Sequence, residues 1–343
     1  KYYGFKEMLR RIREVIEPSR IRYIISNHTE MDHSGSIGKL LEFCPNAEIV
    51  CSPKGKEGLK RHFKKDWKFK IAETLDSLTI GKRTLKFFLT PMVHWPDSMA
   101  TYSTNDNILF SNDAFGQHYA SYERFADEVG ADIIFREAAK YYANIVMPYA
   151  NQVQKVLGVL GSLNLDMICS SHGLIWRDKK DIGNILHLYD KWSRHESENR
   201  VVIVYDTMWH STEKMAIRLY ELIDTYGIPV KLMNLGTSQI SDIVTEIMFS
   251  KFLCVGTPIL NNRMLPAIAA FLMYLKGLKP KNKTGFVFGS YGWSTVGFEE
   301  LKQFLKDAGI SVAGDGAYFN YVPEDSELNK LEWIAREIKR MRS

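Results

Sequence analysis

The sequence has few cysteines, and none of them is spaced to form a metal-binding or redox pair. The four are Cys44, Cys51, Cys169 and Cys254, and no two form a CxxC motif. This absence argues against a zinc ribbon or a rubredoxin-like iron site within these residues. Because Cys51, Cys169 and Cys254 lie in apolar, strand-like runs, we expect buried free thiols and a reducing, cytoplasmic setting.

Long apolar runs and a strong charge excess are also missing. No stretch of about 18 apolar residues is present, so we expect no membrane span, and no signal peptide is recognised. The net charge of +5 over 343 residues is small and spread out, which makes nucleic acid an unfavoured partner. The sequence begins at Lys1 and soon enters a predicted helix, so we expect that upstream residues precede it.

The two halves of the chain are organised differently, and the length is sufficient for two domains. In the first half, clustered short strands with interspersed helices predict a layered α+β domain. In the second half, strands alternate with helices of about ten to fifteen residues, which predicts a parallel, doubly wound α/β sheet. The polar stretch 192–200 is predicted to be a linker. We therefore expect one domain over 1–195 and another over 200–343.

Apolar periodicity and turn residues predict the individual elements. The strands expected in the first half are 21–26, 47–51, 78–80, 84–89, 101–104, 107–111 and 166–170. The helices expected there are 5–16, 35–43, 54–63, 179–193 and a long region within 121–160. The second half is expected to run as strand 201–206, helix 212–226, strand 229–234, helix 240–248, strand 251–256, helix 264–276, strand 284–290, helix 297–308, a short strand near 310–320 and helix 324–342.

One hexapeptide concentrates potential metal ligands. His28, Glu30, Asp32 and His33 fall within six residues, directly after the apolar run 21–25. A tight turn between a buried strand and a helix can aim imidazoles and carboxylates at one point, because the rigid strand fixes where they start. For this hexapeptide alone, a solvated polar loop is the alternative interpretation.

Three further candidates each follow the last apolar residue of a predicted strand. They are His94, Asp113 and His172. Strand ends that meet at one edge of a sheet can build a shared site, although each residue could instead be an ordinary loop residue, and Asp113 could cap a turn. His118 is the nearest competing histidine and is kept as a possible neighbour of the ligands. A set of imidazoles and carboxylates without thiolate suits iron, manganese or zinc.

The second half carries a hydroxyl-rich loop between its first strand and first helix. Hydroxyls, backbone N–H groups and a helix N-terminus together suit a phosphate. The loop has neither the Walker pattern nor G-x-G-x-x-G, so neither an NTPase nor a dinucleotide site is indicated. A simple Ser/Thr N-cap is the alternative. The candidate residues are Thr207, Met208, Trp209, His210, Ser211 and Thr212.

Two more loops are predicted to leave the same carboxyl edge of the sheet, where ligands of doubly wound folds bind. A flat aromatic ring system needs an apolar or aromatic cover and backbone donors near its polar rim. Aromatic side chains in these loops suit that role, although packing is the alternative for each. The candidates are Pro258, Ile259, Leu260, Asn261, Ser290, Tyr291, Gly292, Trp293 and Ser294.

These motifs carry a family resemblance. The order H-x-E-x-D-H, His, Asp, His resembles the metallo-β-lactamase fold, but Glu30 stands where the hydrolases of that fold usually have His. Together with the phrases His94-Trp95-Pro96-Asp97-Ser98-Met99 and Asn112-Asp113-Ala114-Phe115-Gly116, this change is similar to the flavodiiron proteins, or A-type flavoproteins. The resemblance covers almost the whole chain, except for the first strands of the lactamase-like domain, which would precede Lys1.

The resemblance implies a metallo-β-lactamase-like αββα domain followed by a flavodoxin-like domain. It implies one iron ion held by His28, Glu30 and His94, a second held by Asp32, His33 and His172, and Asp113 as the bridge. It also implies that the first loop binds the phosphate of FMN and the other two loops flank its ring. Thr295 stands where many members have Gly.

The function implied is reduction of O2 to water, of NO to N2O, or of both. Electrons would come through FMN from a soluble donor such as rubredoxin or a reduced deazaflavin. A head-to-tail homodimer, or a dimer of dimers, is implied as well. Phe115, Tyr141 and Tyr142 are candidates for lining the metal pocket, with packing as the alternative. Two rival hypotheses remain: a dizinc hydrolase fused to a flavodoxin-like module, and an electron-transfer flavoprotein whose metal half is vestigial.

Overall fold

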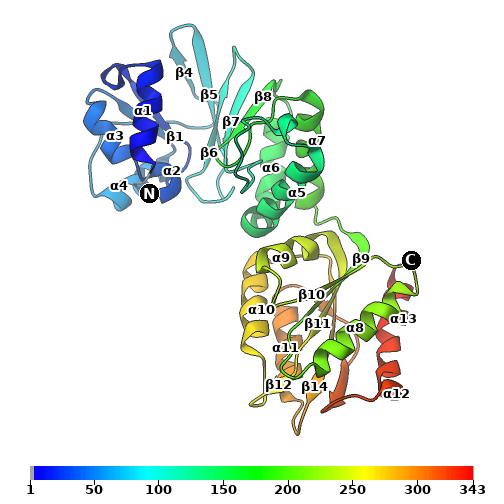
Figure 1. Cartoon of the computed structure of the whole chain (residues 1–343). Helices are drawn as coiled ribbons and strands as arrows, with labels where there is room; N and C mark the ends of the chain where they lie inside the picture. The colour runs from blue at the N-terminus through cyan, green and yellow to red at the C-terminus, as the bar shows by residue number, and fades with distance from the viewer. Residues whose placement is uncertain (1–3, 343) are drawn as a thin grey trace. The chain divides into compact units, whose positions relative to one another are not determined.

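A computed structural model describes residues 4–342 of the chain (Figure 1). Its residues fall into two compact units. The first contains the described residues up to Tyr141 together with Asn151–Asp190, and the second contains Tyr142–Ala150 and the described residues from Lys191 onward. A nine-residue segment therefore packs with the second unit, although the residues on both sides of it in sequence belong to the first.

Two sheets form the centre of the first unit. A parallel sheet has the order β1-β2-β3, and a second sheet has the order β4-β5-β6-β7-β8, which is antiparallel except between β7 and β8. The strands are β1 (Tyr23–Ser26), β2 (Glu48–Cys51), β3 (Phe69–Ile71), β4 (Ser77–Ile80), β5 (Arg83–Leu89), β6 (Met99–Ser103), β7 (Ile108–Asn112) and β8 (Met167–Ser170).

Alternation along β2 explains the layering of this unit. Ile49 and Cys51 pack with Leu59 of the neighbouring helix layer, whereas Val50, between them, packs with Phe87 and Met99 of the second sheet. Successive side chains of a strand point to opposite faces, so β2 is covered on both sides. The helices are α1 (Phe5–Val15), α2 (Met31–Ser34), α3 (Ile37–Phe43), α4 (Pro53–Phe63), α5 (Ala131–Tyr141), α6 (Ala150–Leu160) and α7 (Lys179–Ser193), with 3₁₀ turns at Pro18–Arg20 and Ala126–Glu128.

Several predicted elements of this half are corrected. Strand β3 was missed, because only three residues form it and they are not all apolar. A helix begins at Met31 rather than near residue 35, so the second half of the metal motif is helical. The long region within 121–160 is interrupted by a π-helix, Tyr142–Val146, and by a 3₁₀ turn, Met147–Tyr149, where Pro148 cannot donate a helical hydrogen bond.

The predicted linker 192–200 is also wrong at both ends. Helix α7 continues to Ser193 and strand β9 already begins at Glu198. Trp192 and Ser193 are both buried. Only residues 194–197 lie between the two elements, so the polar composition of the stretch made the predicted linker too long.

The second unit is a parallel sheet in the order β10-β9-β11-β14-β15, and β16 also pairs with β14. This confirms the predicted doubly wound domain. The strands are β9 (Glu198–Tyr205), β10 (Val230–Asn234), β11 (Ser250–Gly256), β14 (Thr284–Tyr291), β15 (Ser311–Val312) and β16 (Ala317–Asn320).

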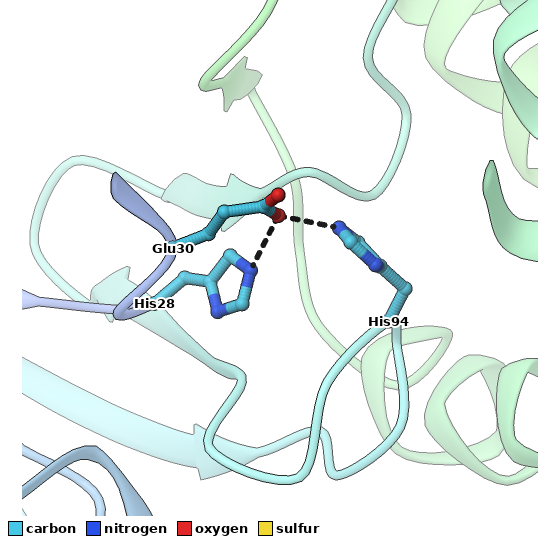
Figure 2. A group of neighbouring side chains, drawn as sticks. All are labelled: His28, Glu30 and His94. Carbon is cyan, nitrogen blue, oxygen red and sulfur yellow. Dashed lines mark hydrogen bonds and ion pairs between the residues drawn. The ribbon is translucent and has the colours of Figure 1, made fainter. Parts of the chain in front are cut away.

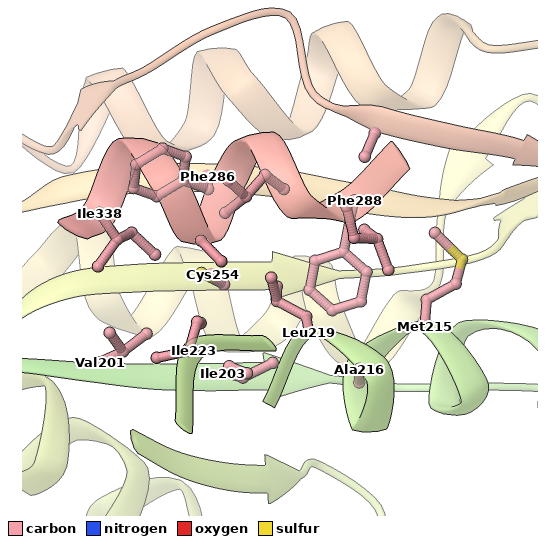
Figure 3. Packing of buried hydrophobic residues seen from close by; sticks show 14 of the residues in the cluster. Val201, Ile203, Met215, Ala216, Leu219, Ile223, Cys254, Phe286, Phe288 and Ile338 are labelled. Atoms are coloured by element: carbon pink, nitrogen blue, oxygen red, sulfur yellow. The ribbon is translucent and has the colours of Figure 1, made fainter. Parts of the chain in front are cut away.

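Helices cover both faces of this sheet. In Figure 1, α8 and α13 lie along one face and α9, α10 and α11 along the other. On the α8 face, Val201 and Phe288 of the sheet pack against Leu219 of α8 and Ile338 of α13 (Figure 3). Full burial of each such side chain contributes about 1.5–3 kcal/mol. The helices are α8 (Ser211–Asp224), α9 (Ile240–Phe249), α10 (Pro266–Leu278), α11 (Val296–Asp307), α12 (Asp325–Leu328) and α13 (Glu332–Met341), with a 3₁₀ turn at Asn329–Leu331.

A small hairpin in this unit was predicted as loop. Strand β12 (Ile259–Leu260) pairs with β13 (Arg263–Met264). Asn261 and Asn262, between them, both have positive φ, 51° and 62°, as a two-residue type I′ turn requires. None of the helices within residues 4–342 is long and apolar enough to cross a membrane.

Candidate metal and flavin sites

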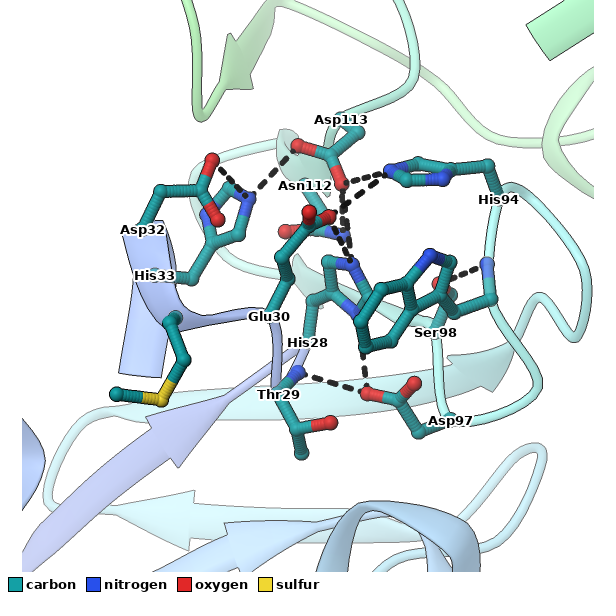
Figure 4. Close-up of polar contacts among 12 residues, drawn as sticks. His28, Thr29, Glu30, Asp32, His33, His94, Asp97, Ser98, Asn112 and Asp113 are labelled. Carbon is teal, nitrogen blue, oxygen red and sulfur yellow. Dashed lines mark hydrogen bonds and ion pairs between the residues drawn. The ribbon is translucent and has the colours of Figure 1, made fainter. Parts of the chain in front are cut away.

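The predicted metal ligands of the first unit come together, and all of them except His172 are labelled in Figure 4. The turn between β1 and α2 supplies His28 and Glu30, and α2 itself supplies Asp32 and His33. The loop between β5 and β6 supplies one histidine, and the residues just after β7 and β8 supply the other two ligands. The seven candidates are His28, Glu30, Asp32, His33, His94, Asp113 and His172.

One group of three ligands centres on the Glu30 carboxylate. Its Oε2 lies 3.4 Å from Nε2 of His28 and 3.5 Å from Nε2 of His94 (Figure 2). One potential ligand atom from each of the three residues lies within 4.8 Å of the other two. Because both imidazoles present Nε2 to the same carboxylate oxygen, the group can hold a cation with two nitrogens and one oxygen.

A second group of three ligands has the same composition. Oδ2 of Asp32 lies 3.5 Å from Nε2 of His33 and 3.3 Å from Nε2 of His172. The ligand atoms of this group also lie within 4.8 Å of one another. Asp32 and His33 are separated by one peptide bond, and they converge because both lie in the first turn of α2.

Asp113 lies between the two groups and is 1% exposed. Its Oδ2 is 3.3 Å from Nε2 of His94 and 3.7 Å from Nε2 of His28, whereas its Oδ1 is 3.0 Å from Nε2 of His33 and 3.3 Å from Nε2 of His172. Each carboxylate oxygen therefore faces one group. Burial opposes ionisation, but the close contacts with these imidazoles outweigh it and hold the pKa of Asp113 far below its usual value.

Unsatisfied polar atoms show that these residues fit a pair of metal ions. Nε2 of His33 and Oδ1 of Asp113 are buried and make no hydrogen bond. Such atoms are costly unless something else binds them. Four neutral imidazoles and three carboxylates carry a charge of about −3, which two divalent cations and one hydroxide would balance. The donor set is hard to intermediate, as suits iron.

The orientation of His28 depends on a residue that sequence reasoning did not place in the site. Asp97 is buried, and its Oδ2 lies 3.0 Å from Nδ1 of His28 and accepts a 2.7 Å hydrogen bond from the Thr29 N–H. A proton on Nδ1 leaves the Nε2 lone pair facing the ligand group. Burial opposes ionisation of Asp97, but hydrogen bonds with His28 and Thr29 lower its pKa. In the sequence, the one feature that could have pointed to Asp97 was its position three residues after His94.

The aromatic candidates separate into different environments. The Phe115 ring packs 4.5 Å from that of Tyr189. Tyr141 is buried, and burial together with the Asp113 charge raises its pKa. The exposed His118 ring lies 4.7 Å from the Tyr141 ring and 5.4 Å from that of His172, so it neighbours the ligands. Tyr142 instead packs against Trp192, with 5.2 Å between ring centroids, inside the second unit.

In the second unit, the predicted flavin loops lie at the carboxyl ends of β9, β11 and β14, which are neighbours in the sheet. Residues 206–210 join β9 to α8, and Ser211 and Thr212 are the first residues of α8. Pro258 and Asn261 flank β12, which contains Ile259 and Leu260. Ser290 and Tyr291 end β14, and Gly292, Trp293 and Ser294 follow them.

These loops form a cradle with one unsatisfied hydroxyl. Oγ1 of Thr207 is buried and makes no hydrogen bond, while Oγ1 of Thr212 lies 3.3 Å from Oγ of Ser290 and links the first loop to the third. Trp209 and Trp293 are 82% and 83% exposed. A buried hydroxyl at a helix N-terminus fits a phosphate, and exposed indoles fit a flat ring that would cover them.

Comparison with known proteins decides the family. Residues 2–173 match the family model described as ODP family beta lactamase, and residues 203–333 match that of flavodoxin. The chain is 41% identical to a nitric oxide reductase of Moorella thermoacetica, covering 98% of this chain and 85% of that protein. It is 38% identical to a rubredoxin-oxygen oxidoreductase of Megalodesulfovibrio gigas, and the match covers 97% of this chain and 84% of that protein. The chain belongs to the flavodiiron protein family.

Solved structures agree. The rubredoxin oxygen:oxidoreductase of Desulfovibrio gigas matches with a TM-score of 0.96 at 38% identity, over 98% of this chain and 85% of that one. The flavodiiron protein of Giardia intestinalis matches with a TM-score of 0.96 at 33% identity. The match covers 100% of this chain and 85% of that one. The predicted fold, a metallo-β-lactamase-like domain followed by a flavodoxin-like domain, is confirmed. For this flavodiiron chain, the implied cofactors are FMN and two iron ions.

Proposed function

We propose that this flavodiiron protein is an oxidoreductase that reduces O2 to water, NO to N2O, or both. The observation that carries the proposal is Asp113, whose two carboxylate oxygens face two separate groups of metal ligands. Relatives named nitric oxide reductase and rubredoxin-oxygen oxidoreductase support both substrates. We assign one metal ion to His28, Glu30 and His94, the other to Asp32, His33 and His172, and the bridge to Asp113.

When bound, the two iron ions would supply electrons and open coordination positions for the gas, and FMN would relay electrons to them. The chain's own residues prepare the site. Asp97 keeps the proton on Nδ1 of His28, so that Nε2 remains a lone-pair donor. Glu30 adds an anionic oxygen where the hydrolases of this fold usually have a neutral imidazole. Tyr141, whose raised pKa keeps its hydroxyl protonated, holds a proton close to the Asp113 carboxylate.

The flavin assignment uses the three loops at the carboxyl edge of the second sheet. We assign the FMN phosphate to residues 207–212, and the edges of the flavin ring to residues 258–261 and 290–294. The buried, unbonded hydroxyl of Thr207 and the exposed indoles of Trp209 and Trp293 support this assignment. We keep 1–195 and 200–343 as the proposed domain ranges.

We also propose a soluble donor, rubredoxin or a reduced deazaflavin, and a head-to-tail homodimer or dimer of dimers. Relatives named rubredoxin-oxygen oxidoreductase and flavorubredoxin support the donor. Four free cysteines, three of them buried, fit the reducing conditions of a cytoplasm. Light scattering of the active form tests the assembly, because a monomer that reduced O2 at full rate would contradict the dimer.

The decisive experiment combines metal analysis with turnover. Protein produced in medium containing both iron and zinc should contain about two iron ions per chain, as the two ligand groups predict. With a chemically reduced mediator, it should consume O2 or NO. Zinc with hydrolase activity would favour the fused hydrolase instead. A Glu30→Ala variant that kept full turnover would favour the electron-transfer flavoprotein with a vestigial metal half.

A further inference from the structure

The third flavin loop, residues 290–294, is held by the strand beside it. Strand β16 pairs with β14 in parallel, and Asn320 lies opposite Tyr291. The side-chain amide of Asn320 donates a 3.2 Å hydrogen bond to the Tyr291 carbonyl and another to the Gly292 carbonyl. The backbone N–H of Tyr321 donates a further 2.7 Å hydrogen bond to the Tyr291 carbonyl. Two consecutive carbonyls of the loop therefore face β16.

An asparagine is suited to these contacts, because its side-chain NH2 group has two N–H donors and can bind two carbonyls at once. Asn320 is exposed, so removing its side chain leaves no cavity in the core. The Tyr321 ring also lies against the loop, since a Cβ atom on Gly292 would lie 3.6 Å from its Cε1. The β16 side of the loop is thus occupied by protein, and a ligand would approach from the other side.

The carbonyl contacts determine where the N–H groups of the loop point. Both peptide bonds are trans, and in a planar trans peptide the C=O and the N–H point in opposite directions. The Gly292 N–H therefore points to the other neighbour of β14, which is β11, and the Trp293 N–H points away from Asn320. Within the part of the chain that the structure describes, neither N–H makes a hydrogen bond.

The β11 side is where the second flavin loop, residues 258–261, leaves the sheet. The proposed flavin ring lies between these two loops. Negative charge on the pyrimidine edge of a flavin increases when the ring takes up two electrons. Fixed N–H donors stabilise a charge that develops beside them, because they need not reorient. Donors aimed at this edge would therefore stabilise the reduced flavin more than the oxidised flavin.

We propose that Asn320 is a positioning residue of the flavin site, which fixes the peptide between Gly292 and Trp293 so that its N–H is directed at the ring and favours the reduced flavin. This inference rests on the FMN site proposed above. Without the Asn320 side chain, the Tyr321 N–H still holds the Tyr291 carbonyl. The Gly292 carbonyl, however, loses its partner, and the following peptide is free to rotate.

The test uses the full chain, freed of flavin and reconstituted with FMN or with riboflavin, and measures the midpoint potential of the bound flavin. Asn320→Ala should lower the affinity for reduced flavin, relative to oxidised flavin, by about tenfold, the loss of roughly one hydrogen bond to a charged group. For a two-electron couple this is a fall of about 30 mV in the potential. Riboflavin should show the same fall, because the contact is with the ring and not with the phosphate.

Two further variants and one control complete the test. Asn320→Leu keeps much of the size of the side chain without its donors and should give the same fall, so either variant alone can decide the outcome. Asn320→Gln keeps both donors on a longer side chain and should give a smaller fall. Asn329→Ala, which removes an exposed asparagine before α13, should leave the potential unchanged.

The midpoint potential separates this role from a merely structural one. A loop that was only loosened would bind oxidised and reduced flavin more weakly by the same factor, and the potential would stay where it is. An unchanged potential in Asn320→Ala or Asn320→Leu, with or without weaker binding, would therefore overturn the inference. Failure of the parent protein to bind FMN would instead overturn the proposed flavin site.

Discussion

Nδ1 of the His28 imidazole lies 3.0 Å from the buried carboxylate of Asp97. Its other nitrogen faces the two ligand carboxylates, Glu30 at 3.4 Å and Asp113 at 3.7 Å. The ring is therefore held by a residue that itself does not reach the metal position, and the tautomer follows from that contact. Orientation and basicity of this ligand depend on a residue 69 positions away in sequence.

The first prediction concerns this contact. Asp97→Asn should lower iron affinity by about 10–100-fold, because an amide holds the imidazole less firmly and does not stabilise its N–H as a carboxylate does. Competition with a chelator measures the effect. Asp106→Asn, which removes an acid paired with Arg83 at the surface of the same unit, is the matched control. Equal affinities in both variants would contradict the role given to Asp97.

The second prediction concerns the residue between the two ligand groups. Asp113→Asn should reduce the iron content from about two ions to one or fewer per chain, because an amide neither carries the negative charge nor offers two equivalent oxygens. Metal analysis after gel filtration measures the stoichiometry. Asp166→Asn, at a largely exposed position near β8, should retain the full content. Two tightly held ions in Asp113→Asn would show that this residue is not the bridge.

The third prediction concerns the unbonded hydroxyl of the phosphate loop. Thr207→Val should weaken FMN binding by about tenfold, the loss of roughly one hydrogen bond to a charged group. It should hardly change the stability of the apoprotein, where this hydroxyl makes no hydrogen bond. Fluorescence titration and thermal unfolding provide the two measurements. Thr225→Val, at the C-cap of α8, is the control for FMN affinity, and unchanged FMN affinity in Thr207→Val would place the phosphate elsewhere.

The fourth prediction concerns a buried lysine in the second unit. Lys283 is 5% exposed and donates a 2.8 Å hydrogen bond to the Met248 carbonyl. Burial and the nearby Arg200 charge lower its pKa from 10.5 to about 7. Between these two values the unfolded chain binds more protons than the folded chain, so this lysine makes stability rise with pH across that window.

Lys283→Met should therefore flatten the rise in the free energy of unfolding between about pH 7 and about pH 10. Denaturant unfolding of the apoprotein at several pH values measures the slope. Lys281→Met, which removes an exposed charge two residues away, should leave the slope nearly intact. If the parent protein showed no rise over this window, the lysine would not be held in a charge-disfavouring environment.

Much of the secondary structure of the second unit can be predicted from the local sequence pattern. Its central strands β9, β11 and β14 contain apolar runs, because both faces of a parallel sheet are buried. Period and run length therefore predict most of these elements. The segment near 310–320, however, forms two strands, β15 and β16, and the predicted helix 324–342 is divided into α12, a 3₁₀ turn and α13. The missed β12–β13 hairpin is two residues per strand, too short to show a period, although its Asn-Asn turn was a usable signal.

The candidate metal site was predictable for a related reason. The proposed ligands follow the ends of apolar strands, namely β1 of one sheet and β5, β7 and β8 of the other, and the ends of packed strands can meet at a shared site. What could not be predicted is which polar neighbours turn inward. Asp97 and His118 both lie close to ligands in sequence, but burial and a hydrogen bond give Asp97 its role, whereas His118 is exposed.

The amino-acid sequence by itself determined the two fold classes, the ligand types and the hydroxyl-rich loop, because these depend on short-range pattern and side-chain chemistry. Tertiary structure alone decided that one Asp113 oxygen faces each ligand group, that Tyr142–Ala150 packs with the second unit, and that Asn320 holds two carbonyls of the third flavin loop. Each of these depends on distances between segments that are brought together only when the chain buries its apolar surface, and no local pattern encodes such a distance.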